Sequence, residues 1–121
     1  MKHYDSIVIG TGQAGVPLAG ALARDGRKVA VIEKGSLGGT CVNDGCTPTK
    51  AYIASARRAW AMRTGSELGV ELRGSIAVDL KKVKARKDAI ISDKHRSLNE
   101  SLDHPNIDLI RGTARFADAH T

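Results

Sequence analysis

The segment SIVIGTGQAGVPLAGALARDGRKVAVIE, residues 6–33, predicts a strand, a helix and a second strand in direct succession. Its opening run of Ile and Val is typical of a buried strand, the Ala- and Leu-rich stretch 13–24 of a helix, and residues 28–32 of the next strand. Pro17 is compatible with the first turn of that helix, and Gly26 ends it. Strands joined in this way are parallel, with a right-handed crossover. We therefore expect an α/β fold with a parallel sheet.

Three glycines separate the first strand from the helix. Gly10 allows a tight turn, Gly12 lets the backbone approach a pyrophosphate, and Gly15 lets the helix lie close to the strand. The helix N-terminus offers free N–H groups and a positive dipole end to phosphates. Glu33 closes the second strand, near the spacing of a carboxylate that hydrogen-bonds a ribose hydroxyl and would repel a 2′-phosphate. The loop predicts a dinucleotide site, and by itself it does not separate NAD from FAD.

The segment GGTCVNDGCTPTK, residues 38–50, contains both cysteines of the chain. Cys41 and Cys46 can close a small disulfide ring if their Cα atoms come within about 6 Å, and Gly45 and Pro48 favour a distorted helix start there. A thiol near a helix N-terminus has a lowered pKa and attacks disulfides as a thiolate. Zinc and iron–sulfur sites need four ligands, so we expect no metal. Two inert buried thiols remain the alternative from these residues alone.

The rest of the chain predicts two more helices and a third strand. A helical pattern, interrupted locally by Gly45 and Pro48, runs from about Cys41 or Cys46 to Met62, and a longer one runs from Asp79, a suitable N-cap, to Leu102. Residues 107–110 follow as a strand. Because this three-stranded parallel sheet would leave edges unpaired, we expect the chain to be the N-terminal portion of a larger protein.

Composition excludes several classes of protein. The chain has 121 residues, 41% of them hydrophobic and 26% charged, which are globular values. The net charge is +6, but aromatic residues make up only 3%, so we interpret the basic middle of the chain as a solvated helix face and expect no nucleic-acid partner. No apolar run approaches the roughly 20 residues of a membrane helix. Without a signal-peptide pattern, we expect a cytoplasmic protein that does not bind membranes.

The glycine loop with Glu33, followed by residues 38–50, resembles the class I pyridine nucleotide–disulfide oxidoreductases, the flavoprotein disulfide reductases. The resemblance covers about residues 4–118. It implies that residues 1–121 are the N-terminal part of a Rossmann-like FAD-binding domain, with the NAD(P)H-binding and dimerisation domains outside this chain. The cofactor-binding positions that the resemblance implies are Gly10, Gly12, Gln13, Ala14, Gly15, Glu33, Lys34, Gly39, Thr40, Cys46, Lys50, Thr113 and Ala114.

The resemblance also implies roles for particular residues. Glu33 would hold the adenosine ribose, and Thr40 and Lys50 would lie along the flavin. Cys46 would be the thiol against the flavin that forms the charge-transfer thiolate, and Cys41 the outer thiol that exchanges with substrate. Residues 112–116 look like the family's strand whose backbone touches the adenine.

The reaction implied by the family passes a hydride from NAD(P)H to FAD, then electrons to the Cys41–Cys46 disulfide, then to a small-molecule acceptor. That acceptor would be a disulfide or a metal ion such as Hg(II), as in the dihydrolipoamide dehydrogenase and mercuric reductase branches. A full-length member would be a homodimer. The alternative is that these 121 residues form a non-catalytic, truncated FAD-binding fragment, and we expect the isolated chain to be inactive.

Overall fold

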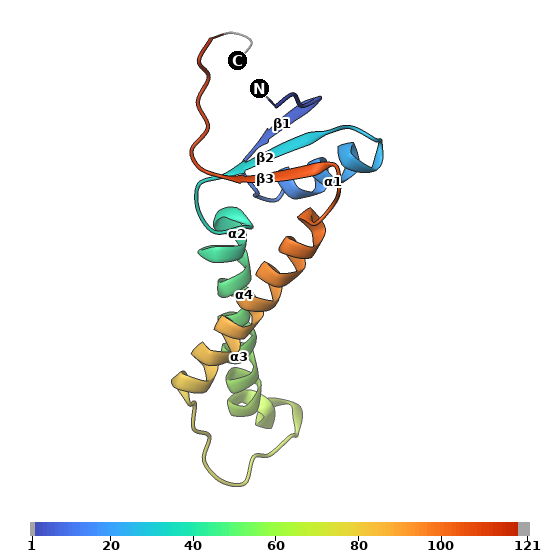
Figure 1. The fold of residues 1–121 in the computed structure, drawn as a ribbon. Coiled ribbons are helices and arrows are strands. Elements are labelled where there is room, and N and C mark those ends of the chain that lie inside the picture. Colours follow the sequence, from blue (N-terminus) through green and yellow to red (C-terminus); the bar gives the residue numbers. More distant parts are fainter. Residues whose placement is uncertain (1, 119–121) are drawn as a thin grey trace.

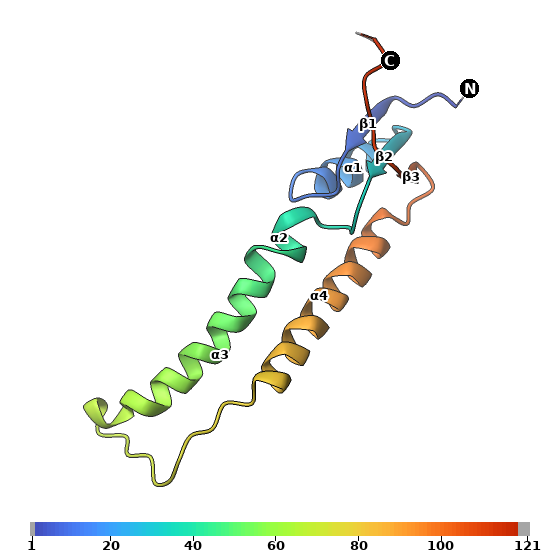
Figure 2. The same cartoon turned by 90° about the vertical axis from the view of Figure 1, so that its left-hand side faces the viewer.

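The computed structural model describes residues 2–118 as a small parallel sheet with a long helical hairpin extending from it (Figures 1 and 2). In chain order the elements are β1 (Ser6–Ile9), α1 (Gly15–Arg24), β2 (Val29–Glu33), α2 (Gly39–Asn43), α3 (Cys46–Thr64), the 3-10 turn η1 (Gly65–Leu68), α4 (Leu80–Leu102) and β3 (Ile107–Arg111).

The sheet confirms the predicted α/β fold. Its order is β1-β2-β3, and both strand pairs are parallel. In the register, Val8 pairs with Val31, which in turn pairs with Leu109. These three side chains contribute to one core with α1 and the C-terminal end of α4, where Leu102 is buried. The other face of β1 is open, because Ile7 and Ile9 are 62% and 58% exposed.

Of the two interruptions predicted in the helical segment near the cysteines, the structure has one. The interruption predicted at Gly45 is confirmed, because the chain turns at Asp44 and Gly45 and divides the helical segment into α2 and α3. The interruption predicted at Pro48 is wrong, because Pro48 lies in the first turn of α3, where its missing N–H has no partner to lose.

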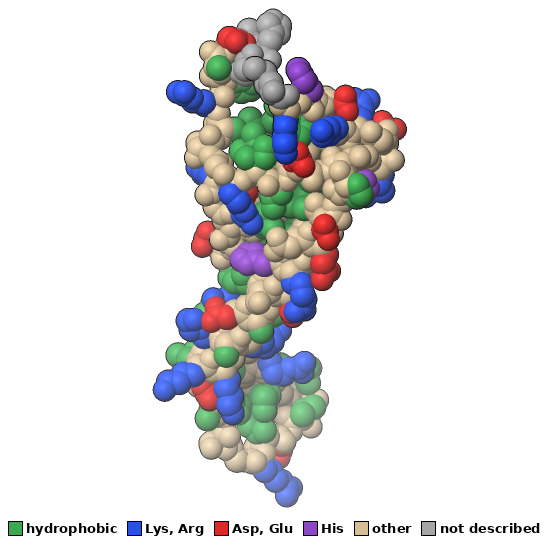
Figure 3. Space-filling model, in the orientation of Figure 1, with side chains coloured by type: hydrophobic (Ala, Val, Ile, Leu, Met, Phe, Trp, Pro, Cys, Tyr) green, Lys and Arg blue, Asp and Glu red, His purple; other side chains and the backbone are tan. Residues whose placement is uncertain are grey.

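The second long helix confirms the prediction. α4 spans Leu80–Leu102, and the Asp79 carboxylate accepts a hydrogen bond from the backbone N–H of Lys82 at 3.1 Å. It pairs with α3, and the Arg86 guanidinium donates to the Ala51 carbonyl oxygen at 3.0 Å. Figure 3 shows Lys and Arg side chains spread over this hairpin. Within residues 2–118, no helix is both long and apolar enough to cross a membrane.

The strand expected at residues 112–116 is wrong. β3 ends at Arg111, and the last bond between the two strands runs from the Gly112 N–H to the Glu33 carbonyl oxygen at 3.0 Å. β2 ends at Glu33, so residues 113–118, the described part of the chain after Gly112, have no β2 residue to pair with. The predicted boundary 1–121 includes Met1 and residues 119–121, which lie outside the described residues.

Candidate functional site

The glycine loop brings the start of α1 against the end of β1. Gly10 has φ +91°, a conformation that favours glycine, and its N–H donates to the Ile32 carbonyl oxygen at 2.8 Å. A Cβ on Gly15 would lie 2.1 Å from the Gly10 carbonyl oxygen and 3.5 Å from the Val8 side chain. A Cβ on Gly12 would meet nothing within 4 Å. The backbone at Gly12 therefore faces free space, as a close approach to a ligand requires.

Glu33 is a buried carboxylate held by three hydrogen bonds. Its Oε2 accepts from the Thr11 N–H at 2.9 Å and from the Thr11 hydroxyl at 2.6 Å, and its Oε1 accepts from the Gly35 N–H at 2.8 Å. The Thr11 hydroxyl bond, more than any other contact, lowers the pKa of Glu33, against the opposing effect of burial. Glu33 is thus an anion at neutral pH, with acceptor capacity left on Oε1.

A cavity of about 210 Å³ opens beside Glu33 at the carboxyl ends of the strands. It brings together five of the predicted cofactor residues from three separate segments of the chain. The lining residues are Ile9, Gly10, Ile32, Glu33, Lys34, Gly112, Thr113 and Ala114. The carboxyl edge of a parallel sheet is where ligands of open α/β folds bind.

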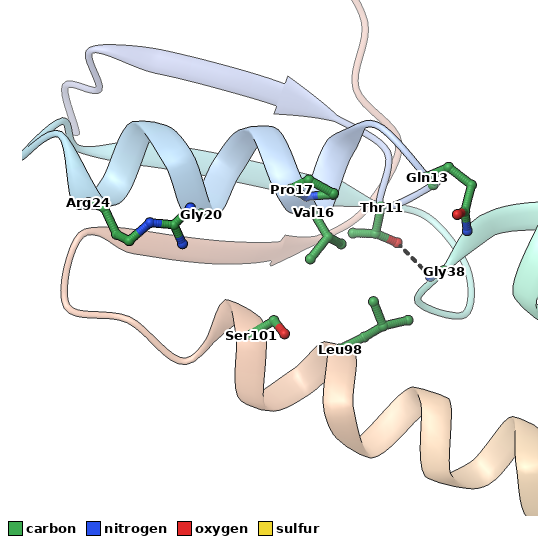
Figure 4. Close-up of a pocket in the computed structure, with 10 residues that line it drawn as sticks. Thr11, Gln13, Val16, Pro17, Gly20, Arg24, Gly38, Leu98 and Ser101 are labelled. Carbon is green, nitrogen blue, oxygen red and sulfur yellow. Dashed lines mark hydrogen bonds between the residues drawn. The ribbon is translucent and has the colours of Figure 1, made fainter.

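A second cavity, of about 430 Å³, lies between α1 and α4 (Figure 4). Gly12 and Gln13 line its end near the glycine loop, across from Gly38 and Leu98. A Cβ on Gly39 would lie 3.1 Å from the Gly12 Cα, so the two glycine turns pack backbone against backbone. Ala14 is exposed and lines neither of these two cavities.

The two cysteines lie on consecutive helices. Cys41 is half-buried on α2, and Cys46 is exposed as the first residue of α3. A Cβ on Gly45 would lie 3.0 Å from the Thr40 carbonyl oxygen, so glycine lets the start of α3 approach α2. Both cysteines are free thiols.

The lowered pKa expected for a thiol at the start of a helix does not describe Cys41, which lies in the middle of α2. Its hydrogen bond with the Cys46 side chain, together with burial and the charge that Cys46 can carry, raises the pKa of Cys41. The backbone hydrogen bond from Cys46 and the positive charge of Lys50 act in the opposite direction but are smaller. Thr40, Cys46 and Lys50 are exposed and line neither cavity beside the glycine loop.

Sequence reasoning missed Asn43 and His95, two polar side chains that hold the cysteine segment in place. The Asn43 amide donates to the carbonyl oxygens of Leu37 at 3.0 Å and Gly39 at 2.9 Å, and its Oδ1 lies 2.7 Å from the His95 Nε2 on α4. Because both amide hydrogens of Asn43 are used, Oδ1 accepts and His95 Nε2 carries the proton. The position of Asn43 between the cysteines was the only signal in the sequence. Thr11 was also missed.

Among the described residues, no group of three or more His, Cys, Asp or Glu side chains is placed to hold a metal ion.

Comparison with known proteins finds matches over nearly the whole chain. Residues 4–120 match the family described as pyridine nucleotide-disulphide oxidoreductase. Dihydrolipoyl dehydrogenase of Bacillus subtilis is 38% identical over 110 residues, which are 90% of this chain and 24% of that protein. Mercuric reductase of Lysinibacillus sphaericus is 34% identical over 120 residues, which are 98% of this chain and 22% of that protein.

A solved structure supports the same relationship. The Cu(II) complex of the HOCl-induced flavoprotein disulfide reductase RclA from Escherichia coli matches with a TM-score of 0.77 and 34% identity. The match covers 96% of this chain and 23% of that one. The chain thus spans about a quarter of the length of the relatives that it matches.

Proposed function

The chain belongs to the pyridine nucleotide-disulphide oxidoreductase family, and from this premise we propose that residues 1–121 form part of an FAD-binding domain that carries the redox dithiol Cys41–Cys46. Glu33 is the observation that carries the proposal. This buried anionic side chain lies at the carboxyl edge of the sheet, beside the glycine loop and a cavity lined by residues 112–114.

The residues present fit the adenosine end of FAD. Oε1 of Glu33 can accept from a ribose hydroxyl, whereas its negative charge disfavours a 2′-phosphate. Gly12 leaves space for a pyrophosphate at the N-terminus of α1. Thr113 and Ala114 line the cavity beside Glu33, together with Ile9 and Ile32, whose apolar side chains suit an adenine ring.

The flavin end would lie toward the cysteines, and FAD when bound supplies a two-electron carrier. Reduction of a Cys41–Cys46 disulfide takes two electrons and two protons and yields the two free thiols found here. In the exchange step, the Cys41 thiolate attacks one sulfur of an acceptor disulfide and expels the other as a thiolate. Cys46 then attacks the Cys41 sulfur, which reforms the internal disulfide and releases the second acceptor thiol.

For the whole protein we propose an oxidoreductase that uses NAD(P)H and passes electrons to a small disulfide or to a metal ion such as Hg(II). The names of two relatives, dihydrolipoyl dehydrogenase and mercuric reductase, support this range of acceptors. The NAD(P)H site, the dimer interface and the segment that completes the FAD-binding domain would lie outside the 121 residues. For this chain alone, the second candidate is a non-catalytic FAD-binding fragment, which its share of about a quarter of each relative favours.

Flavin binding by the purified chain tests the proposal directly. FAD is titrated and its fluorescence and visible absorbance are recorded for the wild type, Gly12→Ala and Gly20→Ala. The new Cβ of Gly12→Ala has space in the fold but enters the path of the pyrophosphate, so we expect at least tenfold weaker binding. Gly20→Ala is the matched control, since its Cβ meets only the flexible end of Arg24 at 3.3 Å. A folded wild-type chain without saturable FAD binding would contradict the proposed site.

The dithiol is tested separately by mild reduction of the FAD-loaded chain. We expect a long-wavelength absorbance band that is kept in Cys41→Ser and lost in Cys46→Ser. The same band in Cys46→Ser would contradict the assigned roles of the two thiols. Turnover with NAD(P)H by the isolated chain would rule out the second candidate.

A further inference from the structure

Thr11, the second residue of the glycine loop, is fully buried and joins two parts of the site. Its hydroxyl donates to Glu33 Oε2 at 2.6 Å. The same hydroxyl accepts from the Gly38 N–H at 3.1 Å (Figure 4). The three groups form a relay in which the Gly38 amide donates to Thr11 and Thr11 donates to Glu33. Thr11 lies 22 residues from Glu33 and 27 residues from Gly38 in the sequence, so only the folded chain creates the relay.

The Gly38 end of the relay sets the start of α2. Gly38 and Gly39 have φ +96° and +60°, and Gly38 is buried. A Cβ on Gly38 would lie 2.6 Å from the Val42 Cβ, so the turn packs directly on the helix that it begins. Cys41 lies one turn into that helix. A shift of the Gly38 amide would therefore move the Cys41 thiol.

We infer that Thr11 is a positioning residue that couples occupancy of the Glu33 site to the reactivity of Cys41. A ligand that hydrogen-bonds Glu33 orders the carboxylate, the carboxylate orders the Thr11 hydroxyl, and the hydroxyl holds the turn at Gly38. The part of this inference that concerns a nucleotide at Glu33 rests on the proposed function. The relay itself does not.

Only a hydroxyl can perform this role. Valine has the shape of threonine but neither donates nor accepts, so Thr11→Val leaves the buried Gly38 N–H without an acceptor and removes one bond from Glu33. Serine keeps both bonds and loses only a methyl group. A residue needed solely for packing would show the reverse order, with valine tolerated better than serine.

The first measurement is hydrogen exchange of the Gly38 amide in the full chain without ligand. We expect exchange at least tenfold faster in Thr11→Val and within twofold of wild type in Thr11→Ser. Thr64→Val is the matched control, because it removes a hydroxyl that donates to the Trp60 carbonyl oxygen at 3.0 Å, at the far end of α3. If Thr11→Val does not fold, Thr11→Ala is measured in its place, since it also lacks the hydroxyl.

The second measurement is the alkylation rate of Cys41 in the Cys46→Ser background, with and without ADP. ADP has the adenosine and pyrophosphate but no flavin, so it cannot cover the thiol itself. We expect saturating ADP to slow alkylation at least threefold when Thr11 is unchanged and in Thr11→Ser, and to have no effect in Thr11→Val.

The outcomes separate the two proposals. Equal Gly38 exchange in wild type and Thr11→Val, or faster exchange in Thr11→Ser than in Thr11→Val, overturns the relay. An ADP effect that persists in Thr11→Val, or no effect in a wild type that binds ADP, overturns the coupling. If the chain binds neither ADP nor FAD but Gly38 amide exchange is still faster in Thr11→Val, the proposed function is contradicted, and with it the coupling to a nucleotide. The hydrogen-bond relay is supported in that case.

Discussion

Replacing Gly15 with alanine should force α1 away from β1. The new Cβ would lie 2.1 Å from the Gly10 carbonyl oxygen, whereas carbon and oxygen atoms in close contact are about 3.3 Å apart. The start of the helix must therefore retreat by roughly 1 Å, which disturbs its packing on Val8. Overpacking of this kind costs about 1–3 kcal/mol or more, which exceeds the gain of up to about 1 kcal/mol from the helix propensity of alanine.

We expect Gly15→Ala to lower the free energy of unfolding by about 2 kcal/mol, or the melting temperature by about 8 °C. Gly20→Ala on the same helix has the same gain in propensity without the backbone collision, so it should be stabilising by about 0.5–1 kcal/mol. Thermal and urea unfolding followed by circular dichroism measure both variants. A Gly15→Ala melting temperature equal to or above that of the wild type would refute the reasoning.

Three further predictions concern other contacts. Asp79→Ala removes the N-cap of α4 and should cost about 1 kcal/mol in urea unfolding, and an unchanged midpoint would contradict a role for the cap. The hydrogen bond from Thr11 lowers the pKa of Glu33, so the stability that this carboxylate contributes is present above its ordinary pKa of 4.5 and is lost as the pH falls through the lower, folded value. Glu33→Gln should abolish that loss, and an equal acid dependence of unfolding in both proteins would refute it. Cys46→Ala should lower the pKa of Cys41, seen as a shift of its alkylation profile to lower pH, because the side-chain hydrogen bond that chiefly raises this pKa is gone; an unshifted profile would place that cause elsewhere.

Much of the fold was predictable because its signals are local. The alternation of strand, glycine turn and helix over residues 6–33 depends on residues close in sequence, and so does the Asp79 cap. The end of β3 was not predictable in this way. Gly112 continues a strand-like sequence, but the strand stops where its neighbour β2 stops, and that limit is set by the partner.

In the candidate site, too, the features that depend on nearby residues were predictable and those that depend on distant contacts were not. The glycine spacing and Glu33 predicted a dinucleotide site after the first two strands, and the structure has a cavity there that Gly10 and Glu33 line. The roles of Thr11 and Asn43 depend on contacts with segments 27 and 52 residues away, which no pattern in the sequence reveals. The raised pKa of Cys41 likewise follows from the position of Cys46 on the next helix, whereas the prediction considered only the helix terminus.

The hydrogen bond between His95 and Asn43 also bears on how the chain reaches its fold. β2 and β3 are neighbours in the sheet, yet the whole helical hairpin lies between them in the sequence. Joining them from an open chain costs closure entropy that rises by about 0.6 kcal/mol for each doubling of the loop. Once α3 and α4 pair, the hydrogen bond between Asn43 and His95 holds together two residues that are 52 positions apart. It thereby shortens the free loop between β2 and β3 by that stretch.

We therefore expect the hairpin to form early and the sheet to close late. Arg86→Ala, which removes a bond between α3 and α4, should then slow refolding more than it speeds unfolding in stopped-flow kinetics, and the opposite partition would contradict this order. On this route the hairpin acts as a folding template that brings the two distant strands within reach of each other.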